Sequence, residues 1–229
     1  MDVFNYAPMT GEYLGRTEAD PSPNEEGKFI IPAAGTIIEP PDVGENEIAV
    51  WTGEEWELQA DYRGQTFYNT EDGSLVSFEL GDIPGDATQM PRSDTEAVWT
   101  GTEWQIPLLI LIEKKRTEIT NERTERIASA KVFFKGHYFD ADQVTQGNLS
   151  STLMAVNSGI YTEPSITWRT ADDESISLAI TELPTLGALM FQVMNTFYGV
   201  SWGLKDQLTP IAEMEYDDAI EALNALVWP

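Results

Sequence analysis

Cysteine is absent from the chain, and histidine occurs only once, at His137. The absence of cysteine excludes disulfide bonds, thiolate zinc sites and a cysteine nucleophile. A single histidine excludes multi-histidine metal sites, and it leaves only one residue that could act as the base of a Ser-His-Asp triad. The motifs of phosphate-binding loops, dinucleotide folds, zinc proteases and the hydrolase nucleophile are also missing. We therefore expect a protein that is not an enzyme, with no catalytic residues, no cofactor and no metal.

Positive charge is scarce as well. The 229 residues include 39 Asp+Glu and only 13 Lys+Arg, so the formal net charge is −26. A surface this acidic repels phosphate backbones, and we expect no nucleic-acid partner. So many carboxylates also leave no particular pair recognisable as a glycosidase site. An enzyme acting on surface polysaccharide is therefore the least supported interpretation.

Long hydrophobic runs are lacking too. The strongest run, Leu108–Ile112, is far shorter than the ~20 residues that a membrane-spanning helix needs. The start of the chain has neither the basic region nor the apolar region of a secretory signal. We therefore expect no membrane insertion and no targeting segment.

Apolar residues are nevertheless plentiful, at 41% of the chain with seven tryptophans, which is enough for a real core. The charge is uneven, because residues 1–104 carry −18 and the remainder carries −8. Prolines also concentrate before residue 92. These shifts predict an α+β protein in three parts. The parts are a β-rich region of short hairpins over 1–106, a connecting helix over 107–130, and a small helix-rich α+β domain over 131–229.

Turn residues between short apolar segments predict hairpins in the first half. Val3–Tyr6 and Glu12–Gly15 flank a turn that contains Pro8 and Gly11, and 65–68 and 75–78 flank a turn with Gly73. No stretch before residue 100 keeps a helical period. The first half is therefore expected to consist of short strands and loops.

One segment of the first half is repeated. Residues 49–58 recur 48 positions later as 97–106, with seven of ten positions identical. Two of the shared positions are tryptophans: Trp51 and Trp56 in the first copy, Trp99 and Trp104 in the second. Each Thr-Gly pair predicts a tight turn that brings its two indoles together across the strands. The pairs suit the core of a small β-unit, a sugar-stacking platform or a partner surface, and we take the four tryptophans as candidate partner-binding residues.

The second half turns helical. Residues 113–128 contain no glycine or proline and carry i,i+4 charge pairs such as Glu122 with Arg126. Their apolar stripe is narrow, which is typical of a helix that connects domains or pairs with copies of itself. Both alternatives stay open.

Further elements follow in the same half. Strands are predicted around Lys135-Gly136, and Asp140 or Asp142 is expected to cap a helix over 143–157. A hairpin over 166–178 comes next. Thr181 is expected to cap a long amphipathic helix, broken by three residues: Gly199, Gly203 and Pro210. A last helix is predicted over 213–226.

Three polar features have a structural and a functional interpretation. Asp140 and Asp142 could hold a cation, but helix capping is the simpler role, since the spacing of a calcium loop is absent. The residues 172–174 are acidic and suit a solvated turn. His137 suits a half-exposed structural position, with a pH switch as the alternative.

The chain resembles bacteriophage tail-fibre assembly and tail-fibre-associated proteins. In the first half the resemblance rests on six segments: Tyr6–Gly15, Ala19–Pro23, Ile31–Ala33, Pro40-Pro41, Val50–Trp56 and Asp61–Tyr68. After residue 116 the chain resembles a small domain of unknown function that often ends such phage proteins. The marks of this domain are Arg126-Ile127, Phe134–Asp142, Trp168–Asp173 and Leu204–Asp206. The second tryptophan copy departs from the usual pattern of the family.

The resemblance implies a partner, the trimeric tail fibre, and a role as assembly chaperone, as a component retained in the virion, or as both. It also implies a location in the host cytoplasm during assembly and in the virion tail, and it raises the expectation of a homo-oligomer, a trimer. The alternatives are a structural tail fibre or baseplate subunit and a host-glycan-binding module of the tail. The family offers no shared catalytic motif to carry over.

Overall fold

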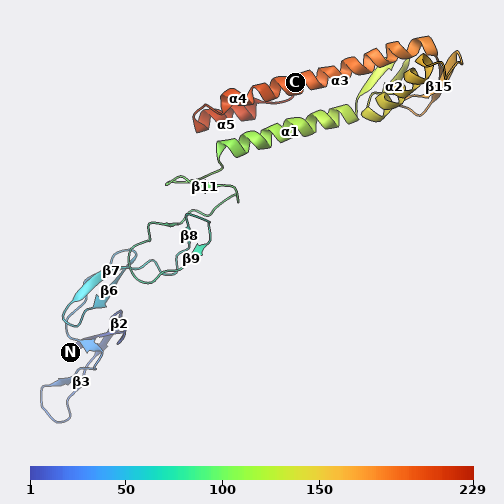
Figure 1. The fold of residues 1–229 in the computed structure, drawn as a ribbon. Helices are drawn as coiled ribbons and strands as arrows, with labels where there is room; N and C mark the ends of the chain where they lie inside the picture. Colours follow the sequence, from blue (N-terminus) through green and yellow to red (C-terminus); the bar gives the residue numbers. More distant parts are fainter. The chain divides into compact units, whose positions relative to one another are not determined.

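The computed structural model describes the whole chain, residues 1–229, as two compact units, Met1–Gln105 and Ile106–Pro229 (Figure 1). The first unit contains only short strands, loops and turns, whereas the second contains all the helices and two β-hairpins. The predicted α+β class, with helices in the C-terminal half, is therefore confirmed.

The first unit consists of twelve strands of two to six residues. They are β1 (Asp2–Tyr6), β2 (Tyr13–Glu18), β3 (Asp20–Pro21), β4 (Phe29–Ile30), β5 (Gly35–Thr36), β6 (Glu47–Trp51), β7 (Trp56–Ala60), β8 (Phe67–Asn69), β9 (Leu75–Val76), β10 (Ala87–Thr88), β11 (Val98–Trp99) and β12 (Trp104–Gln105). Two three-stranded sheets have the orders β2-β1-β5 and β10-β8-β9, and the remaining strands form antiparallel pairs. The predicted hairpins β1–β2 and β8–β9 are confirmed.

The repeat seen in the sequence is part of a larger duplication. In each copy a glycine with positive φ closes the first hairpin turn, Gly11 at 75° and Gly73 at 77°. Each of these glycines donates its N–H over 2.8 Å to a carbonyl four residues earlier. A third strand, β5 or β10, pairs with the first strand of that hairpin, and a tryptophan hairpin follows in both copies. The second tryptophan copy is therefore one end of a second, shorter version of the same unit.

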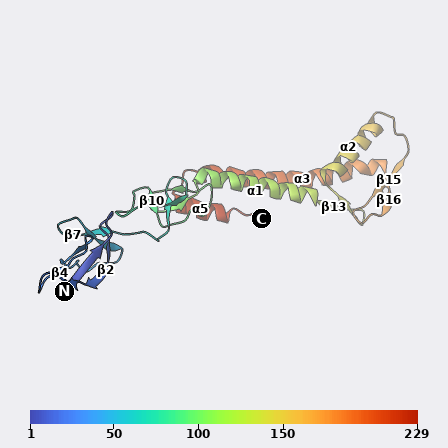
Figure 2. The ribbon, with the colours of Figure 1, turned by 90° about the horizontal axis from the view of Figure 1, so that it is seen from below.

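The second unit contains a long helical pair with a smaller lobe of hairpins and helix. Its elements are α1 (Leu108–Ala128), β13 (Lys131–Phe134), β14 (His137–Asp140), α2 (Gln143–Asn157), β15 (Ser165–Arg169), β16 (Ser175–Ala179), the 3₁₀ turn η1 (Ile180–Glu182), α3 (Leu183–Asp206), α4 (Leu208–Ile211) and α5 (Tyr216–Ala225). Helices α1 and α3 lie side by side in both views (Figures 1 and 2).

Two hydrophobic clusters hold the second unit together. One joins β13–β16 and α2 to the N-terminal half of α3, around Phe139, Leu178 and Leu186. The other joins α1, α4 and α5 to the C-terminal end of α3, where Ile119 and Leu204 are buried. Lys205 of α3 also donates over 2.6 Å to the Thr120 hydroxyl of α1. The narrow stripe of α1 is thus covered by α3 within the same chain.

Local signals placed several of these elements correctly. Lys135 and Gly136 both have positive φ, 52° and 87°, as a tight two-residue turn between β13 and β14 requires. Asp142 caps α2, because its side chain accepts the Thr145 amide over 2.7 Å. The acidic residues 172–174 form an exposed turn between β15 and β16. Capping and turn roles therefore account for these carboxylates.

Two predictions about α3 are wrong. The helix is not broken at Gly199 or Gly203 but continues to Asp206, and Pro210 lies within the short helix α4. Thr181 does not cap it either: Thr181 lies in the 3₁₀ turn, and α3 begins after Glu182 with no side-chain cap. A glycine costs a helix only about 1 kcal/mol relative to alanine, and burial of Leu204 beyond both glycines opposes that cost.

We expect Gly199→Ala and Gly203→Ala each to raise the free energy of unfolding of the second unit by about 0.5–1 kcal/mol. Both glycines are exposed within α3, and a Cβ at either position would contact nothing within 4 Å. Urea unfolding followed by helical circular dichroism measures the change. Gly187→Ala is the matched control, because its Cβ would approach Leu149 to 3.3 Å and the gain should be smaller. An equal gain at all three positions would contradict the expectation.

Candidate functional site

The four candidate tryptophans form two equivalent pairs at the ends of their hairpins. Trp51 faces Trp56 across β6–β7, and Trp99 faces Trp104 across β11–β12. The ring centroids are 5.3 Å apart in the first pair and 5.6 Å in the second, with interplanar angles of 62° and 64°. The predicted cross-strand aromatic pairs are therefore present in both copies.

The connecting turns explain why the geometry is the same. Thr52 donates its hydroxyl to the Glu55 carbonyl over 2.9 Å, and Thr100 donates to the Glu103 carbonyl over 3.0 Å. The glycine after each threonine has a φ of 105°, in the left-handed region that glycine adopts at little steric cost. The shared Thr-Gly thus fixes the turn that brings each indole pair together.

Within each pair the second indole is anchored and the first is not. The Nε1–H of Trp56 donates to the Ile38 carbonyl over 2.7 Å, and that of Trp104 donates to the Met90 carbonyl over 3.0 Å. The indole N–H groups of Trp51 and Trp99 have no acceptor within the chain. Both rings are half-buried. Each hairpin therefore offers one fixed aromatic edge and one free hydrogen-bond donor.

The surroundings of the two pairs differ. Tyr6 stacks on Trp51 with centroids 6.0 Å apart, and Tyr13 meets Trp56 edge-on at 5.6 Å. In the second copy a cation takes this place, since the Arg92 guanidinium lies 5.4 Å from the Trp104 ring centre. None of the four rings lies coplanar with its hairpin partner. The pairs are thus part of small aromatic clusters and lack the flat platform that sugar stacking uses.

Arg92 organises the second copy through backbone carbonyls. Its guanidinium donates to the carbonyls of Ala97 at 2.8 Å, Asp72 at 3.0 Å and Thr95 at 2.5 Å. Hydrogen bonds from a charged group are stronger than those between neutral groups. This one side chain therefore ties the β8–β9 turn to the tryptophan hairpin.

Arg63 has a similar position beside the first copy. Its guanidinium pairs with Glu12, where β2 approaches β6, over 3.0 Å and with Asp61 over 2.9 Å. Hydrogen bonds from Arg63 lower the pKa of Glu12 and that of Asp61 below their usual values of 4.5 and 3.8. Sequence reasoning singled out neither Arg63 nor Arg92, although both are among only four basic residues of the unit.

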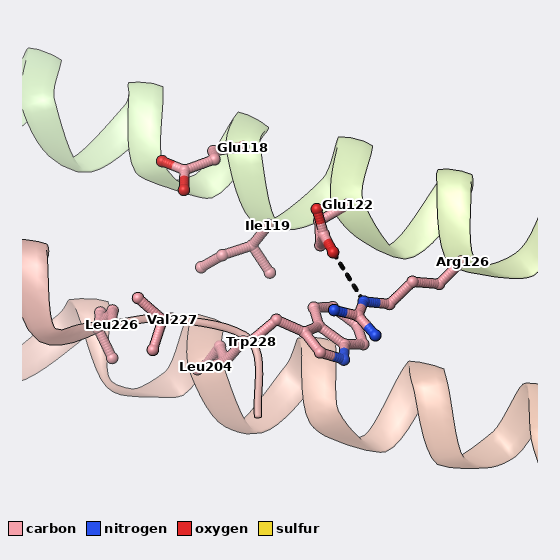
Figure 3. Close-up of a pocket in the computed structure, with 8 residues that line it drawn as sticks. All are labelled: Glu118, Ile119, Glu122, Arg126, Leu204, Leu226, Val227 and Trp228. Atoms are coloured by element: carbon pink, nitrogen blue, oxygen red, sulfur yellow. Dashed lines mark hydrogen bonds and ion pairs between the residues drawn. The ribbon is translucent and has the colours of Figure 1, made fainter.

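The second unit has a pocket of about 260 Å³ between α1 and the C-terminal segment. Figure 3 shows Trp228 beside Arg126, whose guanidinium lies 5.0 Å from the indole centre and bonds Glu122 over 2.7 Å. The predicted Glu122–Arg126 pair is thus present. Trp228 was not found from the sequence, because it follows the last helix without any repeated pattern.

The remaining polar candidates stay apart from these sites. His137 is half-exposed and lies 3.6 Å from a carboxylate oxygen of Glu174. No group of three histidine or acidic side chains is arranged to hold a metal ion. None of the helices combines the length and apolar character needed to cross a membrane. The tryptophan hairpins are therefore the candidate site.

Comparison with known proteins agrees with the resemblance. Residues 111–223 match the family model DUF4376, described as a domain of unknown function. Two curated relatives are 32% identical to the chain over 105 residues, which is 44% of its length. They are the prophage tail fiber assembly protein homolog TfaR of Escherichia coli K12 and the tail fiber assembly protein of Escherichia phage lambda.

The chain spans about half the length of these curated relatives, 53% of the first and 52% of the second. No solved structure matches the chain. The DUF4376 match extends from α1 to α5 and so covers the helical part of the second unit. The resemblance to tail fibre assembly proteins, stated from the sequence, is confirmed.

We expect Arg63→Met to reduce the acid sensitivity of the first unit. The two carboxylates have lowered pKa values in the folded state, so their contribution to stability is present above the usual pKa values. It is lost as the pH falls through the lowered values, below about pH 4. Exciton-coupled circular dichroism of the paired indoles, recorded during urea unfolding at several pH values, follows this unit.

The control for this experiment is Arg16→Met, which removes the same charge from an exposed pair with Asp2. The wild type and the control should lose stability steeply on acidification, and Arg63→Met should lose it less steeply. Parallel pH profiles for all three proteins would contradict the expectation.

Proposed function

We propose that this chain binds a bacteriophage tail fibre protein and assists its assembly. The observation that carries the proposal is the 32% identity to two proteins named for tail fiber assembly. The DUF4376 match gives no mechanism, because that family model is described only as a domain of unknown function. The role in fibre assembly is therefore inferred from relatives that share part of the chain.

The tryptophan hairpins are the contact surface that we propose. Tryptophan and tyrosine are enriched at protein interfaces, since a large apolar ring is combined with a polar atom. Trp51 and Trp99 meet this description, because each indole is half-buried and keeps an unpaired N–H. The anchored Trp56 and Trp104 would hold these rings in place before a partner arrives, which lowers the entropy cost of binding.

The negative charge of the first unit limits the kind of partner surface that it can bind. Residues 1–104 carry −18, so a partner surface with basic or neutral residues is favoured over an acidic one. We propose that this acidic unit contacts the fibre in the host cytoplasm during assembly. After assembly the protein either leaves the fibre or stays in the virion tail. We favour a transient chaperone that leaves, because the named relatives are assembly proteins.

Co-expression tests the assembly role. A bacteriophage tail fibre protein, produced with and without this chain, should yield more soluble trimer when the chain is present. Size-exclusion chromatography with light scattering measures the trimer. An unchanged yield and an unchanged trimer fraction would exclude the chaperone function. Mass spectrometry of purified virions then separates the alternatives, because detection at a fixed copy number would identify a retained component.

A pair of substitutions tests the contact surface. We expect the double variant Trp51→Phe with Trp99→Phe to weaken fibre binding at least tenfold, because the free N–H donors and part of the ring area are lost. The fold should persist, since phenylalanine keeps an aromatic ring in each cross-strand pair. Binding is measured by calorimetry with the purified fibre, and folding by thermal unfolding.

The matched control is Trp168→Phe, a half-buried tryptophan of the second unit, which should leave the affinity unchanged. Equal affinity for the double variant and the wild type would exclude the tryptophan hairpins as the contact surface. It would leave the assembly role itself to be decided by the co-expression experiment.

A further inference from the structure

The outward side of α3 carries no charge until its last residue. Eleven of its 24 residues are exposed, and Asp206 is the one charged member among them. On the neighbouring helix α1, four of nine exposed residues are charged. The outward side of a surface helix normally carries charged as well as polar residues, and here the exposed polar residues before Asp206 are all uncharged. Such an uncharged face is unusual in a chain with a net charge of −26.

Large apolar side chains stand on the same face. Phe191 is 68% exposed and Trp202 is 57% exposed, although both lie on α3, a helix with five buried residues. Trp202 contacts the ring of Tyr198, with centroids 5.7 Å apart. Burial of aromatic rings is among the largest contributions to association. The face therefore combines exposed aromatic area with an absence of charge.

Side-chain sizes along the face follow an order. Phe191, Asn195, Gly199 and Gly203 are spaced four residues apart, so they form one ridge along the helix. The ridge starts with a large side chain and ends with two glycines at which a Cβ would meet nothing inside the chain. These glycines are thus not required by packing within the protein, and they weaken the helix.

We propose that a second copy of this chain covers the face, with the two α3 helices antiparallel about a two-fold axis near residue 197. In this register Phe191 of each copy lies over Gly203 of the other, and Asn195 lies over Gly199. A parallel pair in register would instead set phenylalanine against phenylalanine and glycine against glycine. The size order of the ridge therefore favours the antiparallel pair.

The lack of charge on this face allows a second copy to approach it. Two copies that each carry −26 repel one another wherever their acidic surfaces meet, and the uncharged side of α3 is where they can approach without that repulsion. The acidic residues of α5, Asp217, Asp218 and Glu221, are exposed elsewhere on the same unit. The absence of charge over most of α3 therefore removes repulsion between identical faces, and the size order of the ridge supplies their fit.

The area buried between two α3 helices sets the expected strength of the dimer. A 24-residue helix is about 36 Å long, so a strip about 10 Å wide buries on the order of 400 Å² per copy. The total, on the order of 800 Å², lies below the ~1,200 Å² at which stable complexes begin. We therefore infer a weak, reversible dimer. This differs from the trimer expected from the sequence.

Analytical ultracentrifugation of the full chain from about 1 μM to about 1 mM tests the proposal, because this range covers weak interfaces. The wild type should shift from monomer to dimer. Phe191→Glu and Trp202→Glu should each weaken dimerisation at least tenfold, since each places two like charges in the interface. The matched control is Leu109→Glu, the same change at a 73% exposed leucine of α1, and it should dimerise like the wild type.

Thermal unfolding confirms that each variant is folded. A wild type that stays monomeric over the whole range would overturn the proposal, as would equal weakening by Leu109→Glu. If the wild type stays monomeric and Phe191→Glu abolishes binding of the tail fibre, the face belongs to the fibre and the proposal also fails.

Disulfide cross-linking tests the register, and the absence of native cysteine keeps the result clean. Ala188→Cys and Asp206→Cys lie at exposed positions that face one another across the proposed two-fold axis. A mixture of the two single variants should form a cross-linked heterodimer under mild oxidation. Each variant alone should not, because its two sulfurs lie about 27 Å apart along the antiparallel pair. Efficient cross-linking of either variant alone would overturn the antiparallel register.

Discussion

Burial along one side of α3 is the constraint on which the second unit depends. The N-terminal half of the helix packs on β13–β16 and α2, and its C-terminal end packs on α1, α4 and α5. No other element belongs to both hydrophobic clusters. Interruption of α3 at Gly199 would separate Met190 from Leu204 and so divide the core in two. The continuous helix is thus enforced by contacts at both of its ends, and glycine propensity is too small to oppose them.

Features decided within a few residues could be predicted from the sequence. The Lys135-Gly136 turn, the Asp142 cap and the Thr-Gly hairpins each depend on neighbours no more than five positions away. The course of α3 could not be predicted in this way, because Leu204 is buried against Ile119 of a helix that ends more than fifty residues before α3 begins. Helix breakers are local signals, and their effect is decided by distant packing.

In the candidate site, too, the features set by neighbouring residues could be predicted and those set by distant contacts could not. The tryptophan pairs are visible in the sequence, because the residues that set the hairpin are identical in both copies. The carbonyls that anchor Trp56 and Trp104 lie 18 and 14 residues upstream, at Ile38 and Met90, and a backbone atom leaves no residue signature. The extent of the duplication was hidden for this reason. Arg92 likewise acts on carbonyls, so its partners could not be read from residue type.

The first unit is held together by little buried area. Six of its hydrophobic residues are buried, compared with seventeen in the second unit, and its strands are two to six residues long. Regions with few buried contacts open locally at a low free-energy cost, which amide hydrogen exchange records as weak protection. A ligand that binds only the closed form suppresses such opening by mass action. The tryptophan hairpins therefore belong to the part of the chain whose order responds most to the concentration of whatever occupies them.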